Sequence, residues 1–428
     1  MPYTVVIADD VTGANDIGIM YAGAGLDTYI YSFGDGSVQD YRQCDVLVVD
    51  TDSRFDTRDT AYRKVYEALQ GAPHDGVRQY INKQCSVFRG NIGAEFDAML
   101  DALSEEFAVV VLGFPDNGRT TVGGIHYVSG TPLAESQFAR DPVHPMTKSD
   151  LVEILQEQTH RTVGRIGFEV YEKGTGALEE ALRKARSDMN YCIMDVRDNA
   201  DLQMLAQVLQ DERILCGSSA LSKYLARIAA QKKARPGAIK QIQKNQKIFC
   251  IAGSLTPQTV GQTDYIREQG HAVIELDTTR LFDKAQRQAE CGRIIHKIEE
   301  AYRTQDFVMV HSMNMPEQVA ETKALADRYG IGNTEVSTMV SGTLSEIAAR
   351  VIGAHQIRRV IVCGGDTSAA LCSRLGIRGM KVLAEIEPGL PTCESVDEPR
   401  YRMVLKSGSF GSRSFIDKAR EKLCLEEV

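Results

Sequence analysis

The 428-residue sequence lacks an apolar run long enough to cross a membrane, and its first residues lack the basic and apolar segments of a signal peptide. Its ten cysteines include no C-x-x-C pair, and its eight histidines show no metal-ligand spacing. Cysteines such as Cys192, Cys250 and Cys363 lie instead inside apolar, strand-like runs. These absences argue against a membrane protein and against a structural zinc site. We therefore expect a cytoplasmic protein with reduced, buried cysteines and no protein-bound metal cluster.

Basic residues are also fewer than acidic residues. The sequence has 49 lysines and arginines against 58 aspartates and glutamates, which gives a formal net charge of −9. This balance argues against general binding to nucleic acid or to an anionic membrane, although a local basic pocket is compatible with it. The hydrophobic fraction of 43% and the charged fraction of 25% are typical of a globular protein.

Short apolar runs alternate with helical patterns along the chain, which predicts an α/β fold. The length exceeds that of one hydrophobic core, so we expect two domains, each a mainly parallel sheet flanked by helices. Gln231–Gln246 is basic and polar, and we predict that it separates domains at residues 1–235 and 247–428. The predicted strands are Thr4–Ala8, Val46–Val49, Val109–Leu112, Cys192–Val196, Ile214–Cys216, Ile248–Ala252, Val273–Leu276, Val308–His311, Val360–Cys363 and Val382–Ile386.

The stretch from Gly113 to Ser149 interrupts this alternation. It is rich in glycine, proline, threonine and histidine, and it contains no strand or helix pattern of the kind seen elsewhere in the chain. We predict a long loop, and loops of this length inside a compact domain are often functional.

Acidic side chains follow the first predicted strand directly. Thr4–Ala8 leads into Asp9 and Asp10, and an apolar helical pattern begins soon after them. In open α/β sheets, ligands bind at the carboxyl ends of the strands, so the two carboxylates are candidate site residues. The alternative is that one of them caps the following helix.

Two further clusters of polar residues lie in the N-terminal half. Val46–Val49 is followed by DTDSR, in which Arg54 suits a bidentate grip on a carboxylate or phosphate. Its structural alternative is an ion pair with Asp50 or Asp52. The segment from Asn82 to Gly93 combines a lysine, a serine, an arginine and glycines before a predicted helix start, which could form an anion cradle.

The C-terminal half has glycine-rich turns after three strands. Val360–Cys363 leads into Gly364, Gly365, Asp366 and Thr367, an arrangement that aims backbone N–H groups at phosphate. This turn matches neither the P-loop nor the dinucleotide fingerprint, and a plain turn capped by serine or threonine is the alternative. Similar turns occur at GSLTP and KSGSFG. Three such turns in one domain favour a nucleotide site there, with the acceptor site in the acidic N-terminal half.

The ordered motifs ADDVTGAND, DTDSR, K-x-x-S-x-x-R-G-N-I-G-A-E, GRTTVGGIHYVSGTPLAESQFARDP, GSLTP, GGDTSAAL and KSGSFG resemble those of the four-carbon acid sugar kinases, from residue 4 to residue 420. Members of that family phosphorylate D-threonate, D-erythronate or 3-oxo-tetronates with ATP and give the 4-phosphate. The resemblance implies an acid-sugar-binding N-terminal domain, a nucleotide-binding C-terminal domain and an active site in the cleft between them. Two positions depart from the family pattern, since Cys85 and Val87 stand where aspartate and threonine are usual.

The resemblance also implies roles for single residues. The acid sugar would contact Asp10, Arg54, Lys83, Gln84, Cys85 and Ser86. ATP would contact Ser254, Gly364, Gly365, Asp366, Thr367 and Gly408. In the mechanism that we expect, Arg54 and Lys83 bind the substrate carboxylate, and Asp10 accepts the proton of the terminal hydroxyl. Mg²⁺ would bridge the phosphates, and Asp366 could either assist the metal or cap its helix, of which we favour the cap.

D-threonate is the favoured substrate because the GANDIG form of the first motif looks more like that of the threonate and erythronate kinases. D-erythronate and 3-oxo-tetronate are the alternative substrates. A non-catalytic sugar-acid sensor with the same fold is the rival function, supported by Cys85. We expect a small-molecule sugar acid as the partner, and we leave a homodimer open as the assembly.

Overall fold

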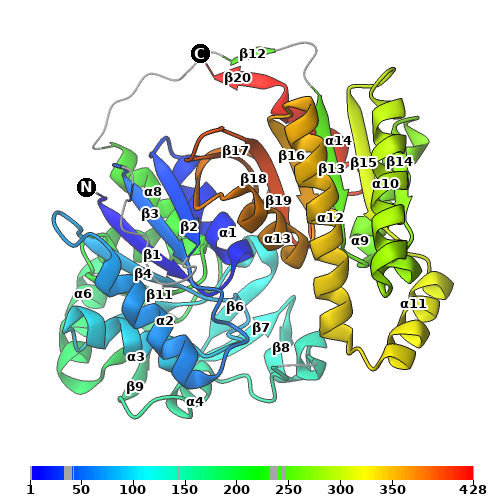
Figure 1. Cartoon of the computed structure of the whole chain (residues 1–428). Coiled ribbons are helices and arrows are strands. Elements are labelled where there is room, and N and C mark those ends of the chain that lie inside the picture. The colour runs from blue at the N-terminus through cyan, green and yellow to red at the C-terminus, as the bar shows by residue number, and fades with distance from the viewer. Residues whose placement is uncertain are drawn as a thin grey trace. The chain divides into compact units, whose positions relative to one another are not determined.

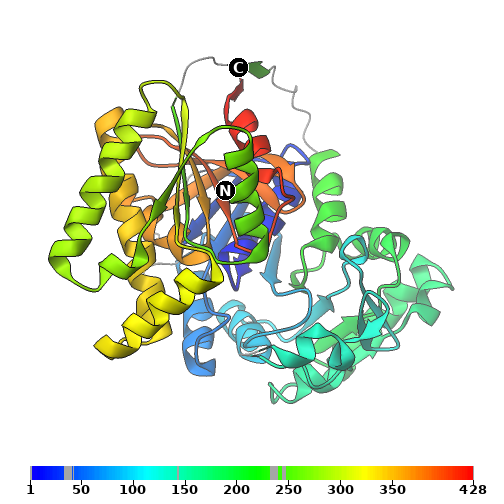
Figure 2. The same cartoon turned by 90° about the vertical axis from the view of Figure 1, so that its right-hand side faces the viewer.

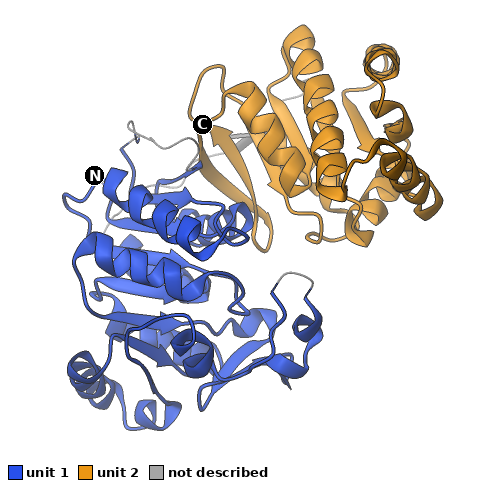
Figure 3. Cartoon of the chain, turned by 60° about the horizontal axis from the view of Figure 1, so that its bottom comes forward, with its two compact units in different colours: residues 1–235 blue, residues 236–428 orange. Residues whose placement is uncertain are grey.

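The computed structural model describes residues 2–32, 41, 43–141, 144–231, 240–242 and 247–427. Its contacts divide the chain into two compact units, residues 1–235 and 236–428, which are coloured separately in Figure 3. Most of the predicted boundary segment, Gln231–Gln246, lies outside the described residues.

Unit 1 is built on a parallel sheet with the strand order β2-β3-β1-β4-β11-β5-β10-β9. The strands are β1 (Thr4–Ala8), β2 (Thr28–Ser32), β3 (Val46–Asp50), β4 (Gln79–Lys83), β5 (Ala108–Val111), β9 (Val163–Ile166), β10 (Tyr191–Met194) and β11 (Ile214–Gly217). The central strands are wholly buried and rich in valine and isoleucine, as expected for a parallel sheet covered on both faces.

Helices pack on this sheet in two groups (Figure 1). One group contains α2 (Arg58–Gly71), α3 (Ile92–Leu103) and α4 (Leu151–Gln156). The other contains α1 (Val11–Ala22), α5 (Phe168–Tyr171), α6 (Thr175–Asp188), α7 (Asn199–Leu209) and α8 (Ala220–Gln231). Because helices cover both faces of the sheet, the last residue of each strand lies at an edge of the sheet.

Unit 2 has a mixed sheet with the order β14-β15-β13-β16-β19-β18-β17. The strands are β13 (Ile248–Ala252), β14 (Ala272–Leu276), β15 (Phe307–Ser312), β16 (Arg359–Cys363), β17 (Gly379–Glu387), β18 (Leu390–Ser395) and β19 (Arg402–Lys406). The pairs from β14 to β19 are parallel, whereas β18 runs antiparallel to both of its neighbours, β19 and β17. A short antiparallel pair joins β12 (Lys240–Ile242) to β20 (Leu425–Glu427).

Helices flank the sheet of unit 2 as well (Figure 2). The helices α9 (Pro257–Glu268) and α14 (Phe415–Leu423) contact each other, and α14 closes a core formed by β13, β15, β16 and β19. The second group contains α10 (Lys284–Ala301), α11 (Pro316–Tyr329), α12 (Asn333–His355) and α13 (Gly365–Leu375).

The α/β fold with two mainly parallel sheets is confirmed, and every predicted strand corresponds to a strand of the structure. All ten cysteines are free thiols. No helix among the described residues combines the length and the apolar character that a membrane span requires.

The prediction of a long loop from Gly113 to Ser149 is wrong. This segment contains the 3₁₀ turns η1 (Pro115–Asn117), η2 (Leu133–Glu135) and η3 (Gln137–Arg140) and an antiparallel sheet of β6 (Arg119–Val122), β7 (Ile125–Val128) and β8 (Thr131–Pro132). Gly123 and Gly124 have φ values of 62° and 84°, which is the backbone of a two-residue hairpin turn. The glycine pair therefore indicates the turn of a β-hairpin. This indication was hard to recognise because the whole segment is rich in glycine.

Candidate functional site

The carboxyl ends of three neighbouring strands of unit 1 lie level with one another. Ala8, the last residue of β1, is in register with Asp50 on β3 and with Lys83 on β4. Residues that follow these strands therefore meet at one edge of the sheet, where open α/β sheets bind ligands. This edge brings together Asp9, Asp10 and Arg54.

Arg54 holds both aspartates. Its Nε and Nη2 donate to the two carboxylate oxygens of Asp9 at 2.7 and 2.8 Å, and its Nη1 donates to Asp10 Oδ2 at 2.6 Å. Asp9 is fully buried, while the Asp10 side chain is 21% exposed. The predicted structural pairing of Arg54 with Asp50 or Asp52 is wrong, because its ionic partners are Asp9 and Asp10. Three of its five N–H donors are already engaged, which leaves two for a substrate.

Asp10 has a second task as the cap of the first helix. Its Oδ1 accepts a hydrogen bond of 2.7 Å from the backbone N–H of Gly13, so the alternative that one aspartate caps α1 is confirmed for Asp10. A Cβ at position 13 would stand 2.7 Å from that oxygen and 3.1 Å from Lys83 Nζ. Glycine is therefore needed for α1 to begin so close to the acidic edge.

The other predicted acceptor residues divide into two kinds. Lys83 Nζ donates to the Gln84 carbonyl at 3.0 Å and lies 3.8 Å from Asp16 Oδ2, so it belongs to the acidic edge. Cys85 and Ser86 are half-buried in the loop after β4. Gln84 is fully buried and donates to Asn82 and Glu95, so it supports the loop from behind.

Two polar residues at this edge were not predicted as site residues. Ser219 Oγ donates to Asp16 Oδ2 at 2.5 Å, and the Asp16 side chain remains 22% exposed. Asp16 belongs to the same ADDVTGAND motif as Asp10, and Ser219 comes two residues after the end of β11. The rule that polar residues collect after strand ends could have found Ser219, had it been applied to Ile214–Cys216.

The edge contains more carboxyl groups than cations. Burial raises the pKa of Asp9, Asp16 and Asp50 above the usual range, and Arg54 and Lys83 partly offset the effect for Asp9 and Asp16. Burial, and after it the nearby charge of Asp9, raise the pKa of Glu95 to about 8. Glu95 accepts hydrogen bonds from Ser53 Oγ at 2.9 Å and Gln84 Nε2 at 2.7 Å. Glu95 therefore retains at neutral pH a proton that the unfolded chain would release.

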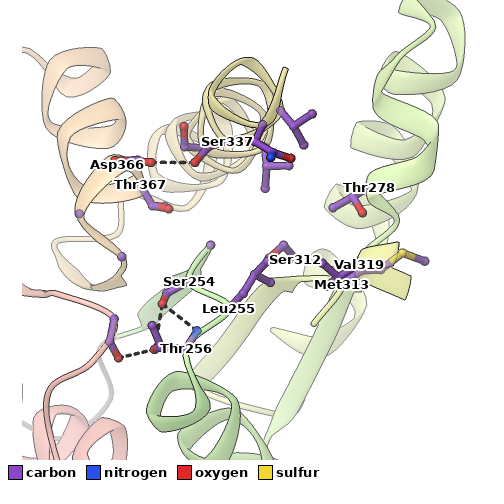
Figure 4. Close-up of a pocket in the computed structure, with 18 of the residues that line it drawn as sticks. Ser254, Leu255, Thr256, Thr278, Ser312, Met313, Val319, Ser337, Asp366 and Thr367 are labelled. Atoms are coloured by element: carbon purple, nitrogen blue, oxygen red, sulfur yellow. Dashed lines mark hydrogen bonds between the residues drawn. The ribbon is translucent and has the colours of Figure 1, made fainter. Parts of the chain in front are cut away.

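Unit 2 contains a pocket of about 560 Å³ (Figure 4). All six residues predicted to bind ATP line it: Ser254, Gly364, Gly365, Asp366, Thr367 and Gly408. One part of the wall is made of small polar residues, whereas Leu255, Met313 and Val319 give another part an apolar surface. This division suits a ligand with a charged end and a flat apolar ring, as ATP has.

Three glycines bring the loops around this pocket into contact. A Cβ on Gly253 would stand 2.3 Å from Thr367 Oγ1, and a Cβ on Gly408 would stand 2.1 Å from Ser254 Oγ. Gly364 has a φ of 129°, in the left-handed region that favours glycine. The backbone can therefore approach a ligand closely from three directions, which fits the polyphosphate of ATP.

Lys406 fastens one of these loops from below. It is 1% exposed, and its Nζ donates to the carbonyls of Ser407 and Gly408 and to Thr259 Oγ1, each within 3.0 Å. The hydroxyls of Thr256 and Thr259 donate to the same Gly408 carbonyl at 2.6 and 2.8 Å. Burial lowers the pKa of Lys406. Among the described residues, no carboxylate forms an ion pair with its ammonium group. Sequence reasoning missed this role because a lysine after a strand has no distinctive pattern.

Asp366 does not cap α13, so that prediction is wrong. The N-cap is Gly364, which has no side chain, and Asp366 lies inside the first turn, where its Oδ2 accepts a hydrogen bond of 2.7 Å from Ser337 Oγ. The helix thus keeps its first N–H groups for a ligand. Among the described residues, no group of three or more histidine, cysteine or acidic side chains could hold a metal by itself. Asp366 and phosphate oxygens together match the ligands that Mg²⁺ prefers.

Two family models match the chain. A sugar-binding N-terminal domain matches residues 4–225, and a nucleotide-binding C-terminal domain matches residues 249–416. The chain is 31% identical over 433 residues to a 3-oxo-tetronate kinase of Cupriavidus necator, with 99% of this chain and 97% of the relative covered. It is 28% identical to a 3-oxo-tetronate kinase of Haemophilus influenzae, with 97% and 98% covered.

Solved structures agree over the whole length. A Salmonella typhimurium LT2 protein has a TM-score of 0.85 at 29% identity, with 98% of this chain and 99% of that chain covered. A Haemophilus influenzae protein has a TM-score of 0.80 at 27% identity, with 97% and 99% covered. The pocket of unit 2 therefore lies in the domain that the family model describes as nucleotide-binding, and the acidic edge lies in the domain described as sugar-binding.

Replacing Glu95 by glutamine is expected to remove a pH-dependent loss of stability. The pKa of Glu95 is about 8 in the folded protein, against an ordinary value of 4.5. Stability is fully present below the ordinary value and falls as pH rises through the folded value, because only the unfolded chain releases this proton in between. In urea denaturation, Glu95→Gln should gain stability over the wild type as pH rises from 5 to 8. The exposed Glu179→Gln should show a constant difference, and a constant difference for Glu95→Gln would contradict the interpretation.

Proposed function

Because this chain belongs to the family of four-carbon acid sugar kinases, we propose that it transfers the γ-phosphoryl group of ATP to the terminal hydroxyl of a four-carbon sugar acid. The observation that supports this most is the pocket of unit 2, where three glycine-rich loops and an uncapped helix N-terminus meet. A kinase needs such a phosphate-binding surface, and a sugar-binding protein alone does not.

Two pieces of evidence bear on the identity of the acid, and they favour different acids. The relatives described above are named 3-oxo-tetronate kinases, which makes 3-oxo-tetronate the first acceptor to test. The GANDIG form of the first motif favours D-threonate, with D-erythronate next. All three acids share a carboxylate at one end and a hydroxyl at the other, so the same site chemistry serves each.

Unit 2 binds the nucleotide in this proposal. The N–H groups at the start of α13, behind Gly364, point at the phosphates, and Ser254 and Thr367 add hydroxyl groups beside them. Lys406 fixes the Gly408 carbonyl and so keeps its loop in contact with Ser254. When bound, ATP supplies the γ-phosphoryl group and Mg²⁺ offsets the charge on its phosphates, with Asp366 as the protein ligand for the metal.

Unit 1 binds the acceptor and supplies the base. Asp10 is partly exposed at the end of β1, and each of its carboxylate oxygens retains a lone pair beyond the bonds to Arg54 and Gly13. It can accept a hydrogen bond from the terminal hydroxyl and take its proton as phosphoryl transfer proceeds. Arg54 keeps Asp10 in place and, because it is also tied to buried Asp9, cannot swing away. In this proposal Arg54 has a positioning role in addition to the predicted contact of its two remaining N–H donors with the acid.

A panel of acceptors tests the function itself. The full chain with ATP and Mg²⁺ should release ADP in the presence of 3-oxo-tetronate, D-threonate or D-erythronate, with one acid preferred over the others by at least tenfold in kcat/KM. L-threonate is the stereochemical control. Binding of an acid without ADP release from any of them would overturn the kinase proposal in favour of a sensor.

Lys406→Met should weaken nucleotide binding selectively. Loss of the ammonium leaves the Gly408 carbonyl with the two threonine hydroxyls alone, so the loop loses its charged support. We expect the KM for ATP to rise about tenfold, in line with the loss of a hydrogen bond to a charged group, with the KM for the acid nearly unchanged. Lys297→Met, on an exposed position of α10, is the matched control. An unchanged KM for ATP, measured on folded variant, would refute this role.

A further inference from the structure

Three arginines interact with the side chain of Cys85. Arg54, Arg89 and Arg119 each interact electrostatically with it. Cys85 is half-buried in the loop after β4, so solvent reaches this side chain.

Arg89 and Arg119 also share one aromatic ring. The guanidinium carbons lie 5.5 and 5.6 Å from the centre of the Phe138 ring, within the range of cation–π contacts. The ring of Phe138, in η3, therefore holds two positive charges near each other. Such an arrangement repels itself unless an anion lies between the charges.

The supply of anions on the protein side is small. Arg89 Nη1 donates to Asp141 Oδ2 at 2.5 Å. Arg119 Nη1 donates to the Asn117 carbonyl, and no carboxylate in the described part of the chain forms an ion pair with Arg119. The Nε atoms of both arginines are buried and have no hydrogen-bond partner in the described part of the chain. Each guanidinium group is half-buried and has five N–H donors, of which the hydrogen bond above engages one, so further donors remain for a ligand.

The fold holds this arrangement in place. Arg119 is the first residue of β6, and the same hairpin presents His126, whose Nε2 lies 2.9 Å from the carbonyl oxygen of Ser86. His126 is buried, and Thr121 contacts its other ring nitrogen at 3.0 Å. The hairpin is therefore fastened to the loop that carries Cys85 and Arg89. The positions of the two arginines are set by packing, as a preformed binding site requires.

We propose that Arg89 and Arg119, which share the Phe138 ring near Cys85, bind the carboxylate of the acceptor acid. The planar fork of an arginine matches a carboxylate, and two arginines with unused donors can hold both of its oxygens. Arg54 links this place to the base, since it interacts with Cys85 and donates to Asp10. An acid held at Cys85 by one end therefore presents its other end toward Asp10. This assignment rests on the proposed kinase function for the identity of the acid, and the presence of an anion site does not depend on it.

The first test compares an acid with its uncharged counterpart. The enzyme should prefer the four-carbon acid identified by the panel over the matching polyol, and Arg119→Gln and Arg89→Gln should each raise the KM for the acid about tenfold or more. The KM for the polyol and for ATP should change little. Arg140→Gln, an exposed arginine of η3 in the same segment, is the control. Equal losses for acid and polyol would overturn the proposal, because a folding or general active-site defect affects both.

The second test needs no turnover. Iodoacetate and iodoacetamide alkylate the same thiols, and they differ in the carboxylate that the proposed site would attract. Relative to the half-buried Cys424 in unit 2, Cys85 should favour iodoacetate by about tenfold in rate, as expected for electrostatic attraction into a charged site. Peptide mapping by mass spectrometry assigns the label. Arg119→Gln should abolish the preference, and added four-carbon acid should protect Cys85.

The two tests separate failure of this proposal from failure of the kinase proposal. If no acid supports ADP release and Cys85 still favours iodoacetate, the carboxylate site stands and the kinase function does not. If ADP is released and Cys85 shows the same reagent ratio as Cys424, the kinase function stands and the site assignment is wrong.

Discussion

The contact of Arg54 with Asp9 and Asp10 is the interaction on which the proposed acceptor site depends. Asp9 is fully buried at the end of β1, and a buried carboxylate without a counter-ion costs several kcal/mol. The bidentate bond to Arg54 offsets that cost and at the same time fixes the guanidinium against Asp10. Removing Arg54 would therefore leave the buried Asp9 carboxylate without a counter-ion and destabilise the fold even in the absence of a ligand. The site is preorganised because its charges are needed for the fold.

In unit 2 the constraint on the pocket is the narrow space between its loops and not the charge of its residues. Its three loops approach one another so closely that a single methyl group on Gly253 or Gly408 would collide with a neighbouring hydroxyl. The lysine that supports them, Lys406, is buried beneath the loop, and its hydrogen-bond partners among the described residues are two carbonyls and one hydroxyl. Charge in unit 1 and close backbone packing in unit 2 match the needs of a sugar acid and a polyphosphate respectively. The chain therefore uses charge in unit 1 and close backbone packing in unit 2 for the two halves of a kinase reaction.

The sequence predicted the parts of this account that depend on local pattern. Buried strands such as β1 and β13 are continuous apolar runs, and the polar or glycine-rich residues after them mark the ligand-binding edges. Antiparallel β18 escaped because its sequence, LPTCES, contains proline and polar residues and is not a continuous apolar run. The hairpin of β6 and β7 escaped because its strands have four residues each and its signal is a turn. The partners of Arg54 could not be predicted, since residues 45 positions apart meet only through strand register. Asp366 was misread because Gly364, without a side chain, occupies the cap position.

The most direct test of the account is the turnover number of Asp10→Asn with the preferred acid. Asparagine caps a helix as well as aspartate does, so the variant should fold and bind ATP normally, and it lacks the basic oxygen. Asp198→Asn, which changes the corresponding cap of α7, controls for any effect of the cap itself. The account predicts that kcat falls at least 100-fold for Asp10→Asn, the usual size of a lost general base, and stays near the wild-type value for Asp198→Asn. A kcat within a few fold of wild type for Asp10→Asn would contradict the account, because the residue that Arg54 holds in place would then not be the base.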